Sequence, residues 1–107
     1  MNYKIHVSHA AEHDLHSAAN YIAHQLQNPL AARRMLTNAL ASIDSLETFP
    51  GRFPEPLLAS HQLHFVPVQN YLLFYRIDSS TQTVHILRFL YGHSDWQAIL
   101  RANVLPT

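Results

Sequence analysis

The 107 residues fit one ordinary domain, residues 1–107, and a hydrophobic share of 48% can fill one core without a disulfide or a metal ion. The chain has no cysteine, which excludes a disulfide framework and thiolate chemistry. Seven Lys and Arg residues balance seven Asp and Glu residues, so the chain lacks the basic excess typical of proteins attracted to nucleic acid.

The N-terminal part predicts a strand followed by a helix. Residues 3–7 alternate between apolar and polar side chains, as a half-buried strand does. Ser8 offers an N-cap for a helix, and Glu12 and Asp14 follow near the positive end of the helix dipole. The helix carries an apolar stripe at helical spacing, formed by Leu15, Ala18, Ala19, Ile22 and Leu26.

A second helix is predicted to begin at Asn28-Pro29, because Asn caps helices and Pro is tolerated at the first helical position. The short connection makes the two helices antiparallel, and alanines on the facing sides permit close approach. Residues 49–54 contain two prolines and a glycine and therefore end the second helix. The apolar side of this helix is formed by Ala32, Leu36, Ala39, Ile43 and Leu46, flanked by Met35 and Leu40.

The second half predicts three strands. Residues 63–66 alternate weakly before Pro67, which is typical of a strand near a sheet edge or of a bulge. Residues 71–77 are almost continuously apolar and aromatic, which predicts a central strand covered on both faces. Residues 78–82 form a turn, and residues 84–91 return as the hairpin partner.

A short final helix is predicted after Gly92, which ends the last strand. Ser94 and Gln97 have the spacing of a capping box, and the helix directs Trp96, Ile99 and Leu100 inward. The resulting order β-α-α-β-β-β-α predicts an α+β fold. In this fold an N-terminal helical hairpin packs on a four-stranded, mainly antiparallel sheet with a short C-terminal helix.

Residues spread over nearly the whole chain share their order and spacing with one family. They are Tyr3-Lys4-Ile5, Ser8, Ala11, Asp14-Leu15, Tyr21-Ile22, Asn28-Pro29, Ala31-Ala32, Leu46, Phe49-Pro50, Arg52, Asn70-Tyr71, Phe74-Tyr75-Arg76-Ile77-Asp78, Ile86-Leu87-Arg88, Tyr91-Gly92, Asp95 and Trp96. On these residues the chain resembles the RelE/ParE superfamily of type II toxin–antitoxin toxins, also described as the plasmid-stabilisation type. The long hairpin with its Asn-Pro-x-Ala-Ala joint resembles the ParE side.

The resemblance implies a toxin that a cognate antitoxin, encoded beside it, neutralises in a hetero-oligomer. ParE-like toxins poison DNA gyrase without a known hydrolytic step, whereas RelE-like toxins cut mRNA in the ribosomal decoding site. A degenerate toxin that only binds its antitoxin and regulates their operon is a third alternative. No cofactor is implied. The N-terminus lacks a signal-peptide pattern and no apolar run approaches the roughly 18 residues of a membrane span, so we expect a cytoplasmic protein without membrane contact.

Enzymatic activity is left open by the resemblance. Cutting RNA without a metal ion needs a base, an acid and cations for the charged transition state. The candidates for catalysis are His64, Arg88, Tyr91 and His93. Arg52 and Arg76 are candidates for contacts to the target or to nucleic acid. Strand alternation places Arg88 and Tyr91 on opposite faces unless the strand bulges before Gly92.

Three positions depart from the ribonuclease side of the superfamily. Those relatives usually have an arginine after the tyrosine that begins the central strand, where this chain has Leu72. Basic residues often follow the glycine after the last strand, where His93 and Ser94 stand, and the preceding strand offers only His64. A missing guanidinium removes a bidentate contact to phosphate, so a binding toxin is favoured over a ribonuclease.

Structural roles compete with these functions. Arg88 fits a salt bridge to an acid such as Asp95 or to an antitoxin carboxylate, and Tyr71 and Tyr75 fit core positions with a satisfied hydroxyl.

The remaining histidines and aromatic residues lead to two further expectations. His9, His13 and His16 share a helix face, but a zinc site would need another ligand, so no metal is predicted. Three helices do not easily cover both sides of a four-stranded sheet, so we expect an apolar patch for a partner. The aromatic residues that need cover are Phe65, Phe74, Phe89 and Tyr91.

Overall fold

The computed structural model describes residues 2–48, 50–52 and 63–103. The elements in chain order are β1 (Lys4–Val7), α1 (His9–Asn20), the π-helical turn η1 (Tyr21–Gln25), α2 (Pro29–Ser45), the 3-10 turn η2 (Pro50–Arg52), β2 (Leu63–Val68), β3 (Tyr71–Asp78), β4 (Thr83–Tyr91) and α3 (Trp96–Asn103). The strands form a sheet in the order β1-β4-β3-β2, with β1 parallel to β4 and the other neighbours antiparallel. This confirms the predicted α+β fold.

The helical hairpin begins each of its helices at a predicted cap. The Ser8 hydroxyl accepts a hydrogen bond from the Ala11 amide, and the Asn28 side chain accepts one from the Ala31 amide, both at 3.0 Å. These contacts satisfy amides that have no partner inside the helix. The second helix ends at Ser45, before the turn η2, while residues 49, 53 and 54 of the predicted terminator lie outside the described residues.

The end of the first helix differs from the prediction. After Asn20 the chain widens into η1, which is closed by a bond from the Leu26 amide to the Tyr21 carbonyl. Gln27 then takes a positive φ of 51° before α2 begins. A π-turn adds one residue to a helical turn and so shifts the residues after it off the regular stripe. The predicted stripe therefore fails at Leu26, which is 57% exposed.

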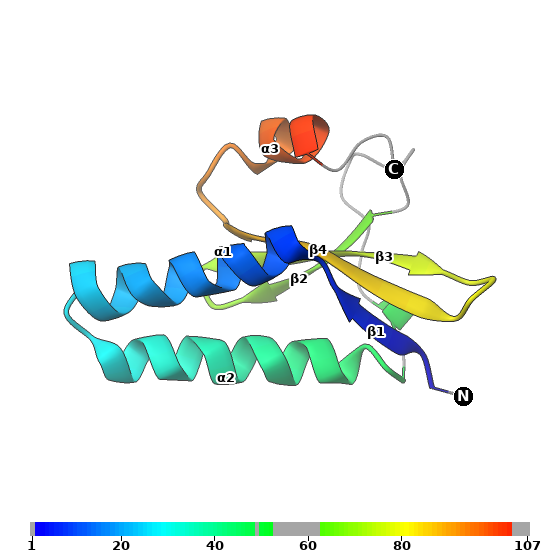
Figure 1. Ribbon diagram of the computed structural model, residues 1–107, viewed down its shortest axis with the longest axis horizontal. Helices are drawn as coiled ribbons and strands as arrows, with labels where there is room; N and C mark the ends of the chain where they lie inside the picture. The colour runs from blue at the N-terminus through cyan, green and yellow to red at the C-terminus, as the bar shows by residue number, and fades with distance from the viewer. Residues whose placement is uncertain (1, 49, 53–62, 104–107) are drawn as a thin grey trace.

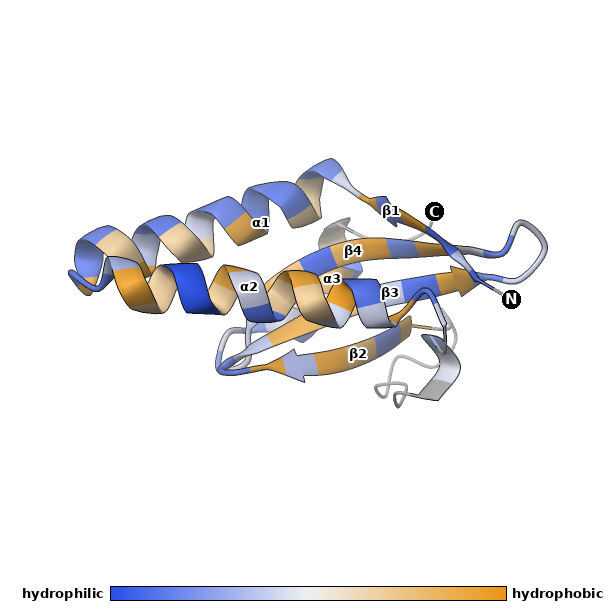
Figure 2. Ribbon diagram, turned by 90° about the horizontal axis from the view of Figure 1, so that it is seen from below, coloured by the Kyte–Doolittle hydropathy of each residue, from blue (hydrophilic) through white to orange (hydrophobic). Residues whose placement is uncertain are grey.

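The helical hairpin packs on one face of the sheet and α3 on the other, so that α2 and α3 lie on opposite sides of it (Figure 1), and Figure 2 views the molecule from the α2 side. The core on the hairpin side includes Leu15, Met35, Ala39, Ile43, Leu73, Tyr75, Val84, Ile86 and Phe89. The smaller core on the α3 side consists of Leu63, Phe74, Leu90 and Leu100. Three consecutive residues of β3, residues 73–75, are fully buried, which confirms the prediction of a central strand covered on both faces.

Helix α1 covers the edge of β4 where β1 has ended. The Ser8 amide donates to the Ile86 carbonyl at 3.0 Å, and the Ser8 hydroxyl donates to the Leu87 carbonyl at 2.9 Å. Further along the same edge, the Phe89 amide donates to the Asp14 carboxylate at 3.0 Å. Ser8 and Asp14 thus take the place of a neighbouring strand, and this edge does not present unpaired peptide groups at these positions.

Two details of the second half correct the sequence predictions. Strand β2 continues through Pro67 to Val68. It is an edge strand, and on its open side the missing N–H of a proline costs no hydrogen bond to a neighbouring strand. Ser94 does not cap the last helix, because α3 begins at Trp96, one residue later than such a cap requires. The Ser94 hydroxyl instead donates to the Tyr91 carbonyl at 2.6 Å. The described part of the chain contains no helix with the length and hydropathy to cross a bilayer.

Candidate functional site

Arg88, a candidate for catalysis, is held in an ion pair. Its Nε lies 2.7 Å from Oδ2 of Asp14 and its Nη2 lies 2.9 Å from Oδ1, so the pair is bidentate. The side chains are only 15% and 9% exposed, and the hydrogen bond with Asp14 raises the pKa of Arg88 above its ordinary value. An ion pair was predicted for Arg88, but Asp14 takes the place of Asp95, because α1 runs along the edge of β4.

His64 lies on β2 and stacks on the ring of Tyr75, its register partner on β3, with ring centroids 5.3 Å apart and an interplanar angle of 18°. Tyr75 is fully buried, and its hydroxyl donates to the Pro50 carbonyl, which confirms the predicted core role of this tyrosine. The imidazole of His64 is half-buried. Tyr75 lies four residues, or about 13 Å, along β3 from Tyr71, which is the register partner of Tyr91. His64 is therefore separated from Tyr91 along the sheet.

Tyr91 and His93 are exposed residues at the end of β4, with ring centroids 5.3 Å apart. The register of β3 and β4 shifts between Phe74 and Tyr75, where Leu87 is the extra residue. This bulge precedes Arg88, so Arg88 and Tyr91 keep the alternation that places them on opposite faces. His64, Arg88, Tyr91 and His93 therefore do not converge on one point.

The two residues predicted to contact the target belong to different elements. Arg52 ends η2, and its side chain is outside the described part of the structure. Arg76 lies on β3 between Leu63 of β2 and His85 of β4, on the face that α3 partly covers.

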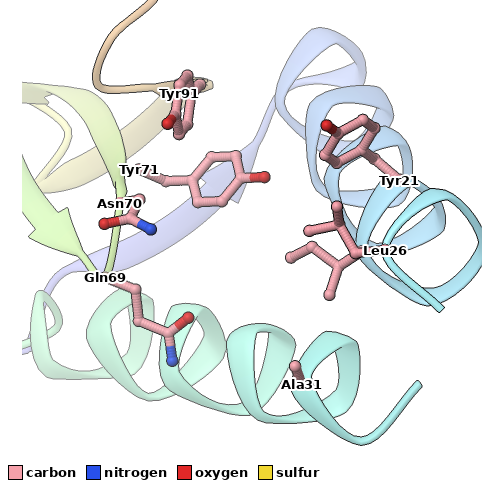
Figure 3. A pocket seen from close by; sticks show the side chains of 8 residues that line it. Tyr21, Leu26, Ala31, Gln69, Asn70, Tyr71 and Tyr91 are labelled. Carbon is pink, nitrogen blue, oxygen red and sulfur yellow. The ribbon is translucent and has the colours of Figure 1, made fainter. Parts of the chain in front are cut away.

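The structure instead brings together a pocket at the joint of the helical hairpin. The aromatic pocket, as it is called below, has a volume of about 580 Å³. Figure 3 shows the Tyr71 ring projecting from the sheet toward Tyr21 and Leu26 of the first helical segment, with Tyr91 beside it. The lining residues are Tyr21, Ile22, Leu26, Ala31, Gln69, Asn70, Tyr71 and Tyr91.

Three local features build the aromatic pocket. The π-turn η1 places Tyr21 and Leu26 outside the core, where they are 53% and 57% exposed. The turn between β2 and β3 contains Gln69, whose φ is 57°, and the Gly92 amide donates to the Asn70 carbonyl at 2.8 Å. The turn and the end of β4 are thereby fixed side by side, opposite the hairpin joint. π-Turns occur frequently at functional sites, which makes this end of the molecule a candidate site.

Tyr71 forms the floor of the aromatic pocket. Its ring stacks on Phe89 at 4.9 Å with an angle of 9° and meets Tyr91 edge-on at 5.7 Å. Burial, followed by the nearby Tyr91 and Tyr21 phenols, raises the pKa of Tyr71 above its ordinary value of 10.0. The lining contains no charged side chain, so the pocket suits an apolar or aromatic group of a partner better than a phosphate.

Sequence reasoning found only part of this site. Tyr71 and Tyr91 were singled out. Of the four aromatic residues predicted to need cover, Tyr91 is exposed at 45%, Phe65 is half-buried, and Phe74 and Phe89 are buried. Tyr21 and Leu26 were missed because a regular helix was assumed up to Asn28, and Gln69 was missed because the turn between β2 and β3 was not singled out. As for metals, the described ranges contain no group of three His, Asp or Glu side chains arranged to hold an ion.

Comparison with known proteins gives one family. Residues 5–96 match the model of the family described as the ParE toxin of the type II toxin–antitoxin system, parDE. Among solved structures, the RelBE2 toxin–antitoxin complex from Mycobacterium tuberculosis is similar at 25% identity and a TM-score of 0.64, over 85% of this chain and 99% of that chain. A chromosomal ParDE system from P. aeruginosa is similar in fold, at 12% identity and a TM-score of 0.70, over 83% and 95% of the two chains. No curated protein matches in sequence.

Proposed function

Since the chain belongs to the ParE toxin family of type II toxin–antitoxin systems, we propose that it arrests growth by poisoning DNA gyrase, without hydrolysing a substrate. One observation carries this choice of mechanism: the Arg88 guanidinium is occupied by the Asp14 carboxylate in a bidentate pair. A guanidinium that stabilises a phosphoryl transition state must face the reacting phosphate. Arg88 faces a helix of its own chain.

The positions of the other candidates support the same proposal. His64 stacks on Tyr75, and Tyr91 lies on the opposite face of β4 from Arg88, so a base, an acid and a cation do not meet around one substrate. The zero net charge also agrees with a toxin that recognises a protein surface in preference to RNA.

A cognate antitoxin is the partner that we propose for the chain in its inactive state, in a hetero-oligomer. The two similar solved structures are toxin–antitoxin complexes, which supports this assignment. The exposed Tyr91, Tyr21 and Leu26 of the aromatic pocket offer the apolar surface that such a partner could cover.

Ribosome-dependent mRNA cleavage is the alternative, favoured by the likeness to RelBE2 over 99% of that chain. The two functions predict different lesions after induced expression. A gyrase poison inhibits supercoiling by purified gyrase and causes double-strand breaks while transcripts stay intact. A ribonuclease cuts transcripts within codons and leaves DNA intact, and this result would reject the gyrase proposal.

Alanine variants make the test sharper. Under the gyrase proposal, H64A and H93A keep full toxicity, because the imidazoles have no chemical role. Under the ribonuclease alternative, at least one of these variants loses transcript cleavage by a factor of about 100 or more, as expected for a general acid or base. If the parent chain causes no growth defect, the degenerate toxin that binds only its antitoxin remains.

A further inference from the structure

Basic side chains form a row across three strands on the sheet face turned away from the helical hairpin. His6 of β1 pairs with His85 of β4, and His85 pairs with Arg76 of β3. Their strand neighbours Ile5 and Val84 point into the hairpin core, which places the row on the opposite face. Residues directly opposite on neighbouring strands have Cβ atoms about 5 Å apart, so the three side chains are adjacent. We call them the cationic row.

The cationic row lies beside the area that α3 covers. Helix α3 packs over Phe74 and Leu90, whereas Arg76 and His85 are two residues from the Asp78–Thr83 pair that closes the β3–β4 hairpin. Figure 1 shows this hairpin extending to the right, away from α3. His6 is exposed, and Arg76 and His85 are half-buried, so the row can be reached from solvent.

Arg76 has no partner for its charge among the described residues. Its Nε atom is buried without a hydrogen bond, and the described salt bridges do not include it. A buried donor without a partner is costly, and such a group usually meets a water, an ion or a ligand. The unpaired guanidinium differs in this respect from Arg88, which Asp14 holds.

Asp78 lies on the same face two residues from Arg76, and its Oδ1 atom is engaged by the neighbouring turn. Asp78 accepts hydrogen bonds from the Ser80 hydroxyl at 2.7 Å, the Ser80 amide at 3.1 Å and the Thr81 amide at 3.4 Å. These bonds hold the pKa of Asp78 below its ordinary value. Lys4, two residues before His6 on the same face, adds another positive charge.

The two histidines stand in a positive environment. Their ring centroids are 5.5 Å apart at an angle of 70°. Burial, then Arg76, then His6 lower the pKa of His85 below 6.5, and Asp78, the last contributor, opposes this shift. An anion placed between Arg76 and His85 would relieve the repulsion and stabilise protonated His85.

We infer that Arg76, His85 and His6 bind a phosphate group. A guanidinium fork and two imidazole N–H groups are donors that come from three neighbouring strands, and the tetrahedrally arranged oxygens of a phosphate group can accept from more than one of them at once. The aromatic pocket lacks such donors with positive charge, so the row is a separate site. The phosphate comes either from a free phosphate or nucleotide or from the phosphodiester of a nucleic acid. The inference does not depend on gyrase being the target.

Titration of the purified, isotope-labelled chain with inorganic phosphate, followed by NMR, tests this site. At about pH 6 we expect shifts at His85, His6 and the Arg76 side chain, together with a rise in the pKa of His85. R76Q should weaken phosphate binding by a factor of about ten or more, because a charge-assisted contact is lost. R34Q is the matched control, since Arg34 is an exposed arginine of α2, and it should bind like the parent chain.

Further probes distinguish the source of the phosphate. If nucleic acid is the source, a thymidine dinucleotide with a single phosphodiester should bind with the same dependence on Arg76. If a free phosphate is the source, inorganic phosphate should bind and the dinucleotide should not. H85N provides a second test should R76Q unfold, and it should also weaken binding. Equal phosphate affinity of the parent, R76Q and H85N would overturn the inference. Tighter binding of a tetraglutamate peptide than of phosphate would overturn it in favour of a carboxylate.

Discussion

Asp14 of α1 binds Arg88 of β4 across 74 residues of sequence, and the same carboxylate accepts the Phe89 amide at the open edge of β4. One side chain thus satisfies both a guanidinium and a backbone donor at the place where β1 no longer covers β4. The contact joins the helical hairpin to the sheet. It also pairs the charge of Arg88, which is then not available to a phosphate of a substrate.

We predict that D14N destabilises the fold by about 2–4 kcal/mol, because it leaves the poorly exposed Arg88 charge without its partner. The free energy of unfolding in urea measures this loss. D44N is the matched control, since Asp44 is an exposed residue of α2 and its change should alter stability by less than about 0.5 kcal/mol. Equal stability of D14N and the parent would contradict a structural role for the pair.

Gly92 should not tolerate a side chain. A Cβ atom at this position would lie 3.1 Å from the Asn70 carbonyl oxygen, a backbone atom that is itself bound by the Gly92 amide. G92A should therefore cost about 1 kcal/mol or more and displace the β2–β3 turn of the aromatic pocket. G51A, where a Cβ would meet nothing within 4 Å, should leave the midpoint of thermal unfolding unchanged or slightly higher.

Tyr71 should ionise at a higher pH than a free tyrosine, because burial and the neighbouring Tyr91 and Tyr21 phenols raise its pKa above 10.0. The folded state then favours the neutral phenol, so this contribution to stability is present below the ordinary pKa and is lost as pH rises through the raised one. NMR of the Tyr71 ring carbon measures the titration directly. Y91F should bring the pKa of Tyr71 closer to its ordinary value, and an unchanged titration would show that Tyr91 has no influence.

His85 should make the fold sensitive to acid. Its pKa lies below 6.5 in the folded chain, so the unfolded chain binds a proton more readily. The stability that this difference provides is complete above about pH 6.5 and is lost as pH falls toward the folded pKa. The free energy of unfolding, measured in urea, should fall less between about pH 7.5 and pH 5 in H85Q than in the parent. H13Q, at an exposed position of α1, should behave like the parent.

Most of the fold could be predicted because its signals are local. Ser8 and Asn28 cap helices through contacts with amides three residues ahead, and residues 71–77 show by their continuous apolar character that they form a covered strand. The capping pattern at Ser94 was misleading, because serine can also bind a carbonyl three residues before it.

The candidate site was less predictable. Tyr71 and Tyr91 were visible as aromatic residues at strand ends, but Tyr21 and Leu26 reach the pocket only through the π-turn, and a single added residue in a helical turn leaves no clear sequence pattern. The same applies to the bulge at Leu87, which precedes Arg88 and so leaves Arg88 and Tyr91 apart.

The sequence by itself determined the order of elements, their main boundaries and the family resemblance, because periodicity, caps and turns depend on residues a few positions apart. The tertiary structure decided which charges meet. Arg88 acquires Asp14, whereas Arg76 lies next to His85 without an ion pair to a described acid, since sheet register brings together residues that are far apart in sequence. For this reason the fold of a ParE-family toxin follows from the sequence, whereas the use of its arginines depends on strand and helix packing.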